Sequence, residues 1–354
     1  MENGQTFIGR GIVYPQKNIG EIVFCTGMTG YQEIVSDPSY HGQILVMTYP
    51  LIGNQGINMD DFKSTKPHIL GLVVKELCDT PSHYKSETTL YDYIKSHQIP
   101  FITDIDTREL TKVIRDYGTM RATISEVEIS TAMIVKKIQS FNLPKDYVSK
   151  VSTNEPYTLN GNGKRVVLID LGVKQGIINE LVKKDFDLTV IPYNSTLNDV
   201  IQYSPDKVIV SDGPGNPKDV KETIHLLKEL IGRVPIFGIC LGHQLLALAC
   251  GADTRKMKFG HRGSNYPVKD IRTNKTFITS QNHSYTVDEI TLIGTELEAI
   301  QVALNDKTIE AIIHKKYPIV SVQYYPVGSS GTEEINRLFV EFLNQERRGE
   351  HGFM

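Results

Sequence analysis

The second half of the chain alternates between short apolar runs and longer amphipathic stretches. Continuous apolar runs at 165–169, 188–191, 207–210 and 235–239 predict strands, and the stretch 174–184 predicts an amphipathic helix between the first two. Strands that are apolar on both faces are typical of a parallel sheet covered by helices. The pattern therefore predicts an α/β domain with a mostly parallel, doubly wound sheet. In such sheets ligands bind beyond the carboxyl ends of the strands.

The first half of the chain has a different pattern. Short β-rich runs at 21–25, 43–48 and 69–75 predict strands, and turn-forming clusters separate them. Helical patterns follow at 88–97 and 107–117. This half predicts a mixed α+β domain.

A polar segment at 152–164 lies between the two patterns. It contains one proline and two glycines and has almost no apolar residues. Such a composition is typical of a linker. A chain of 354 residues also exceeds the usual size of one domain. We therefore predict an N-terminal domain at 1–151, a linker at 152–164 and a second domain at 165–354.

Composition narrows the class of protein. Hydrophobic residues make up 40% of the chain and charged residues 22%, which is ordinary for a globular protein. A net charge of -3, spread along the chain, argues against binding to nucleic acid or to an anionic membrane. The N-terminus has no basic region followed by an apolar run, and no window approaches the ~18 apolar residues of a membrane span. We expect a cytoplasmic protein.

The four cysteines are scattered, at Cys25, Cys78, Cys240 and Cys250. They form no C-x-x-C pair, so buried, reduced thiols are the simplest interpretation. No spacing of His, Cys, Asp or Glu indicates a metal site.

Cys240 has a context that the other cysteines lack. The strand at 235–239 leads into 238–244 (GICLGHQ), and a helical stretch follows at 245–249. G-x-C-x-G at such a strand–turn–helix is the thiol counterpart of the G-x-S-x-G nucleophile elbow. In so sharp a turn, side chains two residues before and after the nucleophile would clash, which explains Gly238 and Gly242. The start of a helix favours thiolate over thiol, and backbone amides at the turn can face an oxyanion. A core cysteine at a strand end would explain neither glycine.

A second glycine-rich loop, 211–217 (SDGPGNP), directly follows the strand at 207–210. It ends a strand of the same predicted sheet, so its backbone amides should lie on the same rim as Cys240. A role in oxyanion or substrate binding follows. A nucleotide site is the competing interpretation, but the chain has no G-x-x-x-x-G-K-[ST], and no G-x-G-x-x-G opens a helix after a strand. We expect no ATP site on this chain.

Together, 238–244 and 212–217 resemble the class I, or triad, glutamine amidotransferases. The N-terminal half resembles the small chain of carbamoyl-phosphate synthetases, in the strings at 28–33 (MTGYQE), 37–40 (DPSY), 48–50 (TYP), 52–54 (IGN) and 106–111 (DTRELT). The resemblance covers nearly the whole chain. It implies hydrolysis of L-glutamine to glutamate and ammonia. The ammonia would pass through a tunnel to a large chain that makes carbamoyl phosphate from bicarbonate and two ATP, for arginine or pyrimidine biosynthesis.

The resemblance also implies roles for individual residues. Cys240 would be the nucleophile that forms a γ-glutamyl thioester, and the backbone amides of Gly213 and Leu241 would form the oxyanion hole. Ser284 and Tyr285 stand where the family usually has glycine and phenylalanine. This chain would carry no cofactor, because ATP and Mg²⁺ belong to the large chain. The residues implied to hold glutamine are Ser39, Gly213, Gly215, Leu241, Gln244, Asn282, Ser284 and Tyr285.

The chain departs from the family near its C-terminus. The family motif V-Q-[FY]-H-P-E supplies the histidine that acts as general base and the glutamate that orients it, whereas residues 322–327 read VQYYPV. Tyr325 and Val327 therefore occupy the histidine and glutamate positions. Tyrosine, with a pKa of ~10, is a poor acceptor for the thiol proton at neutral pH. General acid–base catalysis is worth about 10² to 10⁴ in rate, so we expect impaired glutaminase activity.

Two histidines are candidates to replace the missing base. His243 lies on the elbow helix and is expected to point away from the thiol, and His283 lies in the expected glutamine-binding segment. We expect neither to rescue the reaction. His261 and His41 have no motif context and are expected at the surface or in loops.

Three interpretations stay open at this point. The chain could be a working glutaminase, a small subunit with crippled glutaminase that serves an ammonia-dependent synthetase, or a non-catalytic regulatory or scaffolding relative that only docks on a large chain. Retention of Cys240, both elbow glycines, Gln244 and Ser39 favours the second. Whether the changes at the triad are natural or introduced stays open as well.

Overall fold

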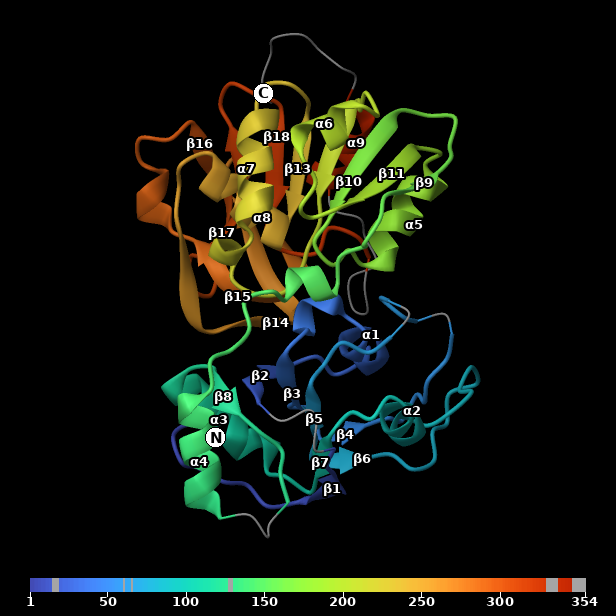
Figure 1. Cartoon of the computed structure of the whole chain (residues 1–354), viewed down its shortest axis with the longest axis vertical. Coiled ribbons are helices and arrows are strands. Elements are labelled where there is room, and N and C mark those ends of the chain that lie inside the picture. Colours follow the sequence, from blue (N-terminus) through green and yellow to red (C-terminus); the bar gives the residue numbers. More distant parts are fainter. Residues whose placement is uncertain (15–18, 60, 65, 127–129, 329–336, 346–354) are drawn as a thin grey trace. The chain divides into compact units, whose positions relative to one another are not determined.

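A computed structural model describes residues 1–14, 19–59, 61–64, 66–126, 130–328 and 337–345. The chain forms two compact units, Met1–Pro144 and Lys145–Met354 (Figure 1). The boundary thus precedes the predicted linker at 152–164. That segment belongs to the second unit because its polar groups bind there: the Thr153 amide donates to Asp170 Oδ2 at 2.7 Å, and Tyr157–Leu159 forms strand β9.

The N-terminal unit is built on a mixed sheet. In the part of this unit that the structure describes, the sheet has six strands in the order β1-β7-β5-β3-β2-β8. The central strands run parallel, and β1 and β8 are antiparallel edges. The strand bounds are β1 (Arg10–Ile12), β2 (Gly20–Cys25), β3 (Gln43–Met47), β5 (Gly71–Val73), β7 (Phe101–Thr103) and β8 (Met120–Ala122), beside a small pair of β4 (Leu51–Ile52) and β6 (Glu76–Leu77).

Short helices lie between these strands: α1 (Tyr31–Val35), η1 (Pro38–Tyr40), α2 (Leu90–Ser96) and α3 (Thr107–Tyr117). Helix α4 (Thr131–Ser140) follows the last strand, β8. The predicted bounds of α3 are confirmed. Asp106 fixes its start, because its carboxylate accepts the Glu109 amide at 2.9 Å and satisfies a donor that has no partner within the helix.

The C-terminal unit holds the second sheet. Its described residues form ten strands in the order β15-β14-β16-β17-β18-β13-β12-β10-β11-β9. The central strands β18, β13, β12, β10 and β11 run parallel, and the strands outside them pair antiparallel. The bounds are β10 (Arg165–Asp170), β11 (Asp187–Pro192), β12 (Lys207–Val210), β13 (Ile236–Ile239), β14 (Thr254–Asp270), β15 (Thr276–Val287), β16 (Leu297–Ala303), β17 (Ile309–His314) and β18 (Ile319–Val322).

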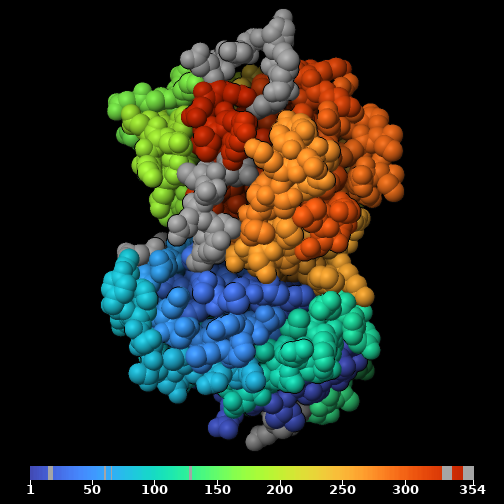
Figure 2. All heavy atoms as spheres, turned by 180° about the vertical axis from the view of Figure 1, so that it is seen from behind, coloured from blue at the N-terminus to red at the C-terminus, as the bar shows by residue number. Residues whose placement is uncertain are grey.

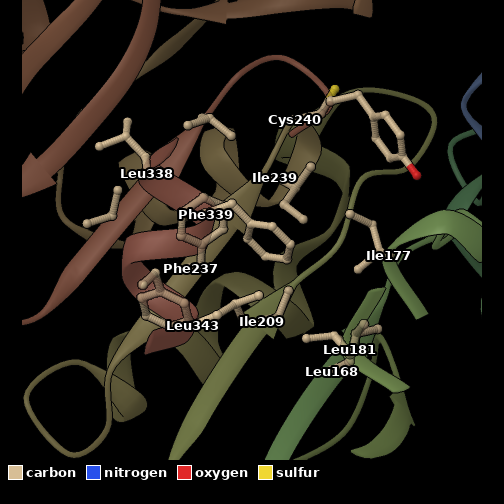
Figure 3. Close-up of a cluster of buried hydrophobic side chains, with 14 of the residues drawn as sticks. Leu168, Ile177, Leu181, Ile209, Phe237, Ile239, Cys240, Leu338, Phe339 and Leu343 are labelled. Atoms are coloured by element: carbon tan, nitrogen blue, oxygen red, sulfur yellow. The ribbon is translucent and has the colours of Figure 1, made fainter. Parts of the chain in front are cut away.

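Helices cover both faces of this sheet. Apolar residues of α5 (Gln175–Lys183) and α9 (Arg337–Asn344) pack with one set of strand side chains. Those of α6 (Leu197–Ile201), α7 (Lys221–Leu230) and α8 (Leu241–Ala249) pack with the other (Figure 1). Figure 3 shows Phe237 of β13 beside Phe339 of α9 in the first core. The red C-terminal segment is visible at the surface in Figure 2. Three short helical turns, η2 (Val148–Lys150), η3 (Pro217–Asp219) and η4 (Glu289–Leu292), complete the unit.

The predicted fold class is confirmed. Every strand predicted in the second half is present to within two residues, and the central parallel strands are apolar on both faces because each face carries helices. None of the helices described is both long enough and apolar enough to cross a membrane.

Candidate active site

Cys240 lies between the last residue of β13 and the first residue of α8, at the tip of the strand (Figure 3). Its backbone has φ 51° and ψ -100°, a conformation that residues with a side chain rarely adopt. The Cys240 amide donates to Val322 O of β18 at 2.8 Å, which fixes the turn to the neighbouring strand. This is the geometry predicted for a nucleophile elbow.

The two glycines around Cys240 are required by close backbone packing. A Cβ on Gly238 would lie 2.8 Å from the carbonyl carbon and oxygen of Gly242. A Cβ on Gly242 would lie 2.8 Å from the carbonyl carbon of Val210 at the end of β12. Each separation is shorter than van der Waals contact. The clash inferred within the turn is found at Gly238, whereas a side chain at Gly242 would meet the neighbouring strand β12.

The loop after β12 lies against the elbow, as its position in the sheet predicted. The Gly242 amide donates to Ser211 O at 3.1 Å, and Ser211 Oγ accepts the Leu171 amide at 2.9 Å. A Cβ on Gly213 would overlap the carbonyl oxygen of Leu171, and Gly215 has φ 94°. Both positions of the loop therefore require glycine. Without side chains there, the backbone amides of Gly213 and Gly215 are the groups that these two residues can offer to an oxyanion or substrate.

Strand β15 carries three of the predicted glutamine-binding residues. Asn282 O lies 3.6 Å from Cys240 Sγ, and the buried Asn282 Nδ2 has no hydrogen-bond partner among the described residues. Ser284 Oγ accepts a hydrogen bond from the guanidinium of Arg262, so the side chain that replaces glycine is held by a buried cation. The Tyr285 carbonyl accepts Gln244 Nε2 at 2.7 Å. The strand thus reaches the thiol.

Gln323 is a contact of the thiol that sequence reasoning missed. It is fully buried, its Nε2 lies 3.6 Å from Cys240 Sγ, and its Oε1 accepts Gln244 Nε2 at 2.9 Å. The sequence could have revealed Gln323, because it lies two residues before Tyr325 in an extended segment, and alternate residues of a strand face the same side. Neither its amide nor the Asn282 carbonyl can take up the thiol proton.

Ser39 lies in the N-terminal unit, within η1. Its amide donates to Asp37 Oδ1 at 2.9 Å, and no described residue hydrogen-bonds its buried Oγ. Its part in glutamine binding stays a prediction.

Tyr325 and Val327 follow β18. The Tyr325 amide donates to Ser280 O of β15 at 3.0 Å, and its side chain is buried in the core that α5 and α9 cover. Lys174 Nζ lies 4.7 Å from the centre of the Tyr325 ring and 3.0 Å from Asp212 Oδ2. Val327 packs against the same core. The position of the family base is therefore filled by a packed aromatic ring that has no basic nitrogen.

The contacts of His243 and His283 agree with the expectation that neither replaces the base. His243 is fully buried, its Nδ1 lies 2.8 Å from Ser321 Oγ, and burial lowers the pKa of His243 to about 3. His283 Nδ1 lies 2.8 Å from the Tyr285 carbonyl, and burial lowers the pKa of His283 well below its ordinary value. Both imidazoles are engaged in structural hydrogen bonds and stay neutral.

His261 was expected at the surface or in a loop, and that expectation is wrong, because it lies within strand β14. It is 3% exposed because β14 turns its ring inward, between Gln281 Oε1 at 2.7 Å and Asp306 Oδ2 at 2.9 Å. His261, His283 and Glu310 bring possible metal-ligating atoms within 4.8 Å of one another, a grouping that sequence spacing did not reveal. The Gln281 side chain already contacts all three residues, which makes the cluster a hydrogen-bonded core. Burial raises the pKa of Glu310 well above its ordinary value.

Two family models match the chain. Residues 1–124 match the carbamoyl-phosphate synthase small chain, CPSase domain, and residues 167–345 match the class-I glutamine amidotransferases. A solved glutamine amidotransferase from Thermotoga maritima is 20% identical, with a TM-score of 0.38 over 46% of this chain and 75% of that one.

Relatives match over nearly the whole length. The carbamoyl phosphate synthase small chain of Bacillus caldolyticus is 52% identical over 343 residues, covering 97% of this chain and 94% of the relative. The carbamoyl phosphate synthase pyrimidine-specific small chain of Bacillus subtilis (strain 168) is 51% identical over 354 residues, covering 99% and 97%. These relatives and the two family models together show that the chain belongs to the carbamoyl-phosphate synthase small-chain family.

Proposed function

We propose that this chain is the glutamine-hydrolysing small subunit of a carbamoyl phosphate synthase, and that its own glutaminase activity is impaired. The observation that carries the proposal is an intact elbow at Cys240 beside a strand that places Tyr325 and Val327 where the family has its base and the partner of that base. The large chain would bind bicarbonate, ATP and Mg²⁺ and would use the ammonia.

The proposed reaction begins with attack of Cys240 Sγ on the γ-carboxamide carbon of glutamine. The oxyanion would be held by the backbone amides of Gly213 and Leu241. As the C–S bond forms and the C–N bond breaks, the thiol must lose a proton and the departing ammonia must gain one. Water would then hydrolyse the thioester to glutamate. Asn282, Ser284, Tyr285, Gly215, Gln244 and Ser39 would hold the substrate.

Impairment follows from the proton transfers. Tyr325 is neutral at pH 7 and carries no basic nitrogen, so it neither accepts the thiol proton readily nor delivers one to ammonia. A loss of about 10² to 10⁴ in kcat is expected relative to a chain with the complete triad. Activity that remains would come from the helix start at Cys240 and from the oxyanion hole.

The test is glutamate and ammonia release by the full chain, alone and with a carbamoyl phosphate synthase large chain. The variant Tyr325→His/Val327→Glu should raise kcat by about 10² to 10⁴. Tyr157→His/Val182→Glu makes the same exchanges at side chains that are 40% and 47% exposed, and should change nothing. Glutamate release by the native chain at the same measurable rate as by the first variant would refute the impairment.

The large chain adds a second arm. Full synthesis of carbamoyl phosphate from added ammonia, with little from glutamine, is the expected behaviour of the complex. If the large chain binds but the triad variant still releases no glutamate, the chain is a regulatory or scaffolding relative. Failure to bind any large chain would refute the subunit assignment. The Bacillus subtilis small chain is named as pyrimidine-specific, and we propose that this chain also serves pyrimidine biosynthesis. The test is whether the chain restores growth of a pyrimidine auxotroph when ammonia is supplied.

A further inference from the structure

Helix α5 contains a glycine that its own backbone does not require. Gly176 is the second residue of this helix, and its φ is not positive. Any L-residue could adopt this conformation, and alanine would be favoured there over glycine. The reason for glycine must therefore lie in what packs against it.

The atoms nearest to Gly176 belong to the two changed triad positions. A Cβ built on Gly176 would overlap Tyr325 Oη, and its next contacts would be Tyr325 Cζ at 3.6 Å and Val327 Cγ1 at 3.9 Å. The last two are ordinary van der Waals separations. Among the described residues, the phenolic oxygen is thus the atom that excludes a Cβ at position 176.

We infer that Gly176, Tyr325 and Val327 form one packing unit, in which glycine on α5 makes room for the phenol that replaces the catalytic base. This deepens the proposed function, on which it rests, because it says what the two replacements at the triad pack against.

Contacts on the ring face support this inference. Lys174, the residue before α5, places Nζ 4.7 Å from the centre of the Tyr325 ring. The same Nζ pairs with the carboxylate of Asp212, in the loop that carries Gly213. Tyr325 as a whole is only 8% exposed. The Tyr325 ring thus contacts both Lys174 and Gly176 at the start of α5, and the loop holds the lysine through Asp212.

The inference is tested by a double-mutant cycle on the full chain, measured as melting temperature. In the native background, Gly176→Ala should lower the melting temperature by at least about 2 °C, because the methyl overlaps Tyr325 Oη. In the Tyr325→Phe background that oxygen is gone, and the same Gly176→Ala change should raise the melting temperature by about 1–4 °C. The sign of the effect reverses on deletion of one atom.

Lys183→Ala, an exposed change on the same helix, is the control and should have equal effects in both backgrounds. The same sign for Gly176→Ala with and without the Tyr325→Phe substitution would overturn the inference. The melting measurements need no glutaminase activity, so failure of the proposed function and failure of this inference are distinguishable.

Discussion

Replacing Cys240 by glycine should cost less folding stability than a change to glycine usually does, because the backbone at position 240 is strained. With φ 51° and ψ -100°, Cys240 lies outside the regions that residues with a Cβ populate. Such a conformation costs about 1–3 kcal/mol, and glycine largely avoids this cost. A comparison of Cys240→Ala with Cys240→Gly isolates the strain, because both variants lack the thiol.

The stability difference between alanine and glycine at position 240 is compared with the same difference at a helical position. Ala247, within α8 and fully buried, has an ordinary helical environment. Ala247→Gly should lower the free energy of unfolding by about 2 kcal/mol, from helix propensity and the loss of one buried methyl group. The same alanine-to-glycine difference at position 240 should be smaller by about 1–3 kcal/mol. The Gly variant at 240 should therefore lie within about 1 kcal/mol of the Ala variant in stability.

The assay is urea-dependent hydrogen exchange of amides in β13 and α8, which reports unfolding of the C-terminal unit. Both substitutions at 240 should also abolish any glutamate release. The reasoning is refuted if glycine at 240 costs as much, relative to alanine, as glycine at 247. That result would mean that the sharp turn is not a reservoir of strain.

Three further outcomes follow from buried groups. Because burial raises the pKa of Glu310, the folded carboxyl keeps its proton to higher pH than the unfolded one, so stability should fall, with a slope of at most about 1.4 kcal/mol per pH unit, as the pH rises through its ordinary pKa. Glu310→Gln should remove that slope in urea titrations at pH 5–8. His243 has its pKa lowered to about 3, so its unfolded form binds the extra proton, and stability should fall as pH drops below ~6.5. His243→Asn should flatten this acid limb of the stability curve. Gly242→Ala should lower the free energy of unfolding by about 1–3 kcal/mol, because its methyl meets the Val210 backbone at 2.8 Å, with calorimetry as the measurement.

Local sequence determined the elements that one short segment can specify by itself. The apolar run of β12 and the capped helix α3 have the predicted bounds, because strand and helix periodicity and an N-cap residue are properties of neighbouring residues. Part of the elbow was predictable for the same reason, since a Cβ on Gly238 would meet the backbone of Gly242, four residues along the chain. The need for glycine at 242 comes from Val210 on the neighbouring strand β12.

Local sequence did not determine the elements that depend on partners far away in the chain. Strand β14 spans 17 residues although it contains Gly260, Gly263 and Pro267, which punctuate local structure. Its antiparallel partner β15 supplies the hydrogen bonds that hold it extended, with register shifts where the pattern breaks. The polar segment before β10 has the composition of a linker, but it is part of the second unit because its hydrogen-bond partners lie on β10 and β11.

By itself, the sequence determined the order of domains, the elbow at Cys240 and the replacement of histidine and glutamate by Tyr325 and Val327. Tertiary structure alone decided what those replacements contact. It placed Gly176, about 150 residues earlier in the chain, against both of them, and it buried His261 among hydrogen-bond partners. Periodicity and motifs describe neighbours along the chain, whereas the space available to a side chain is set by every element that packs around it.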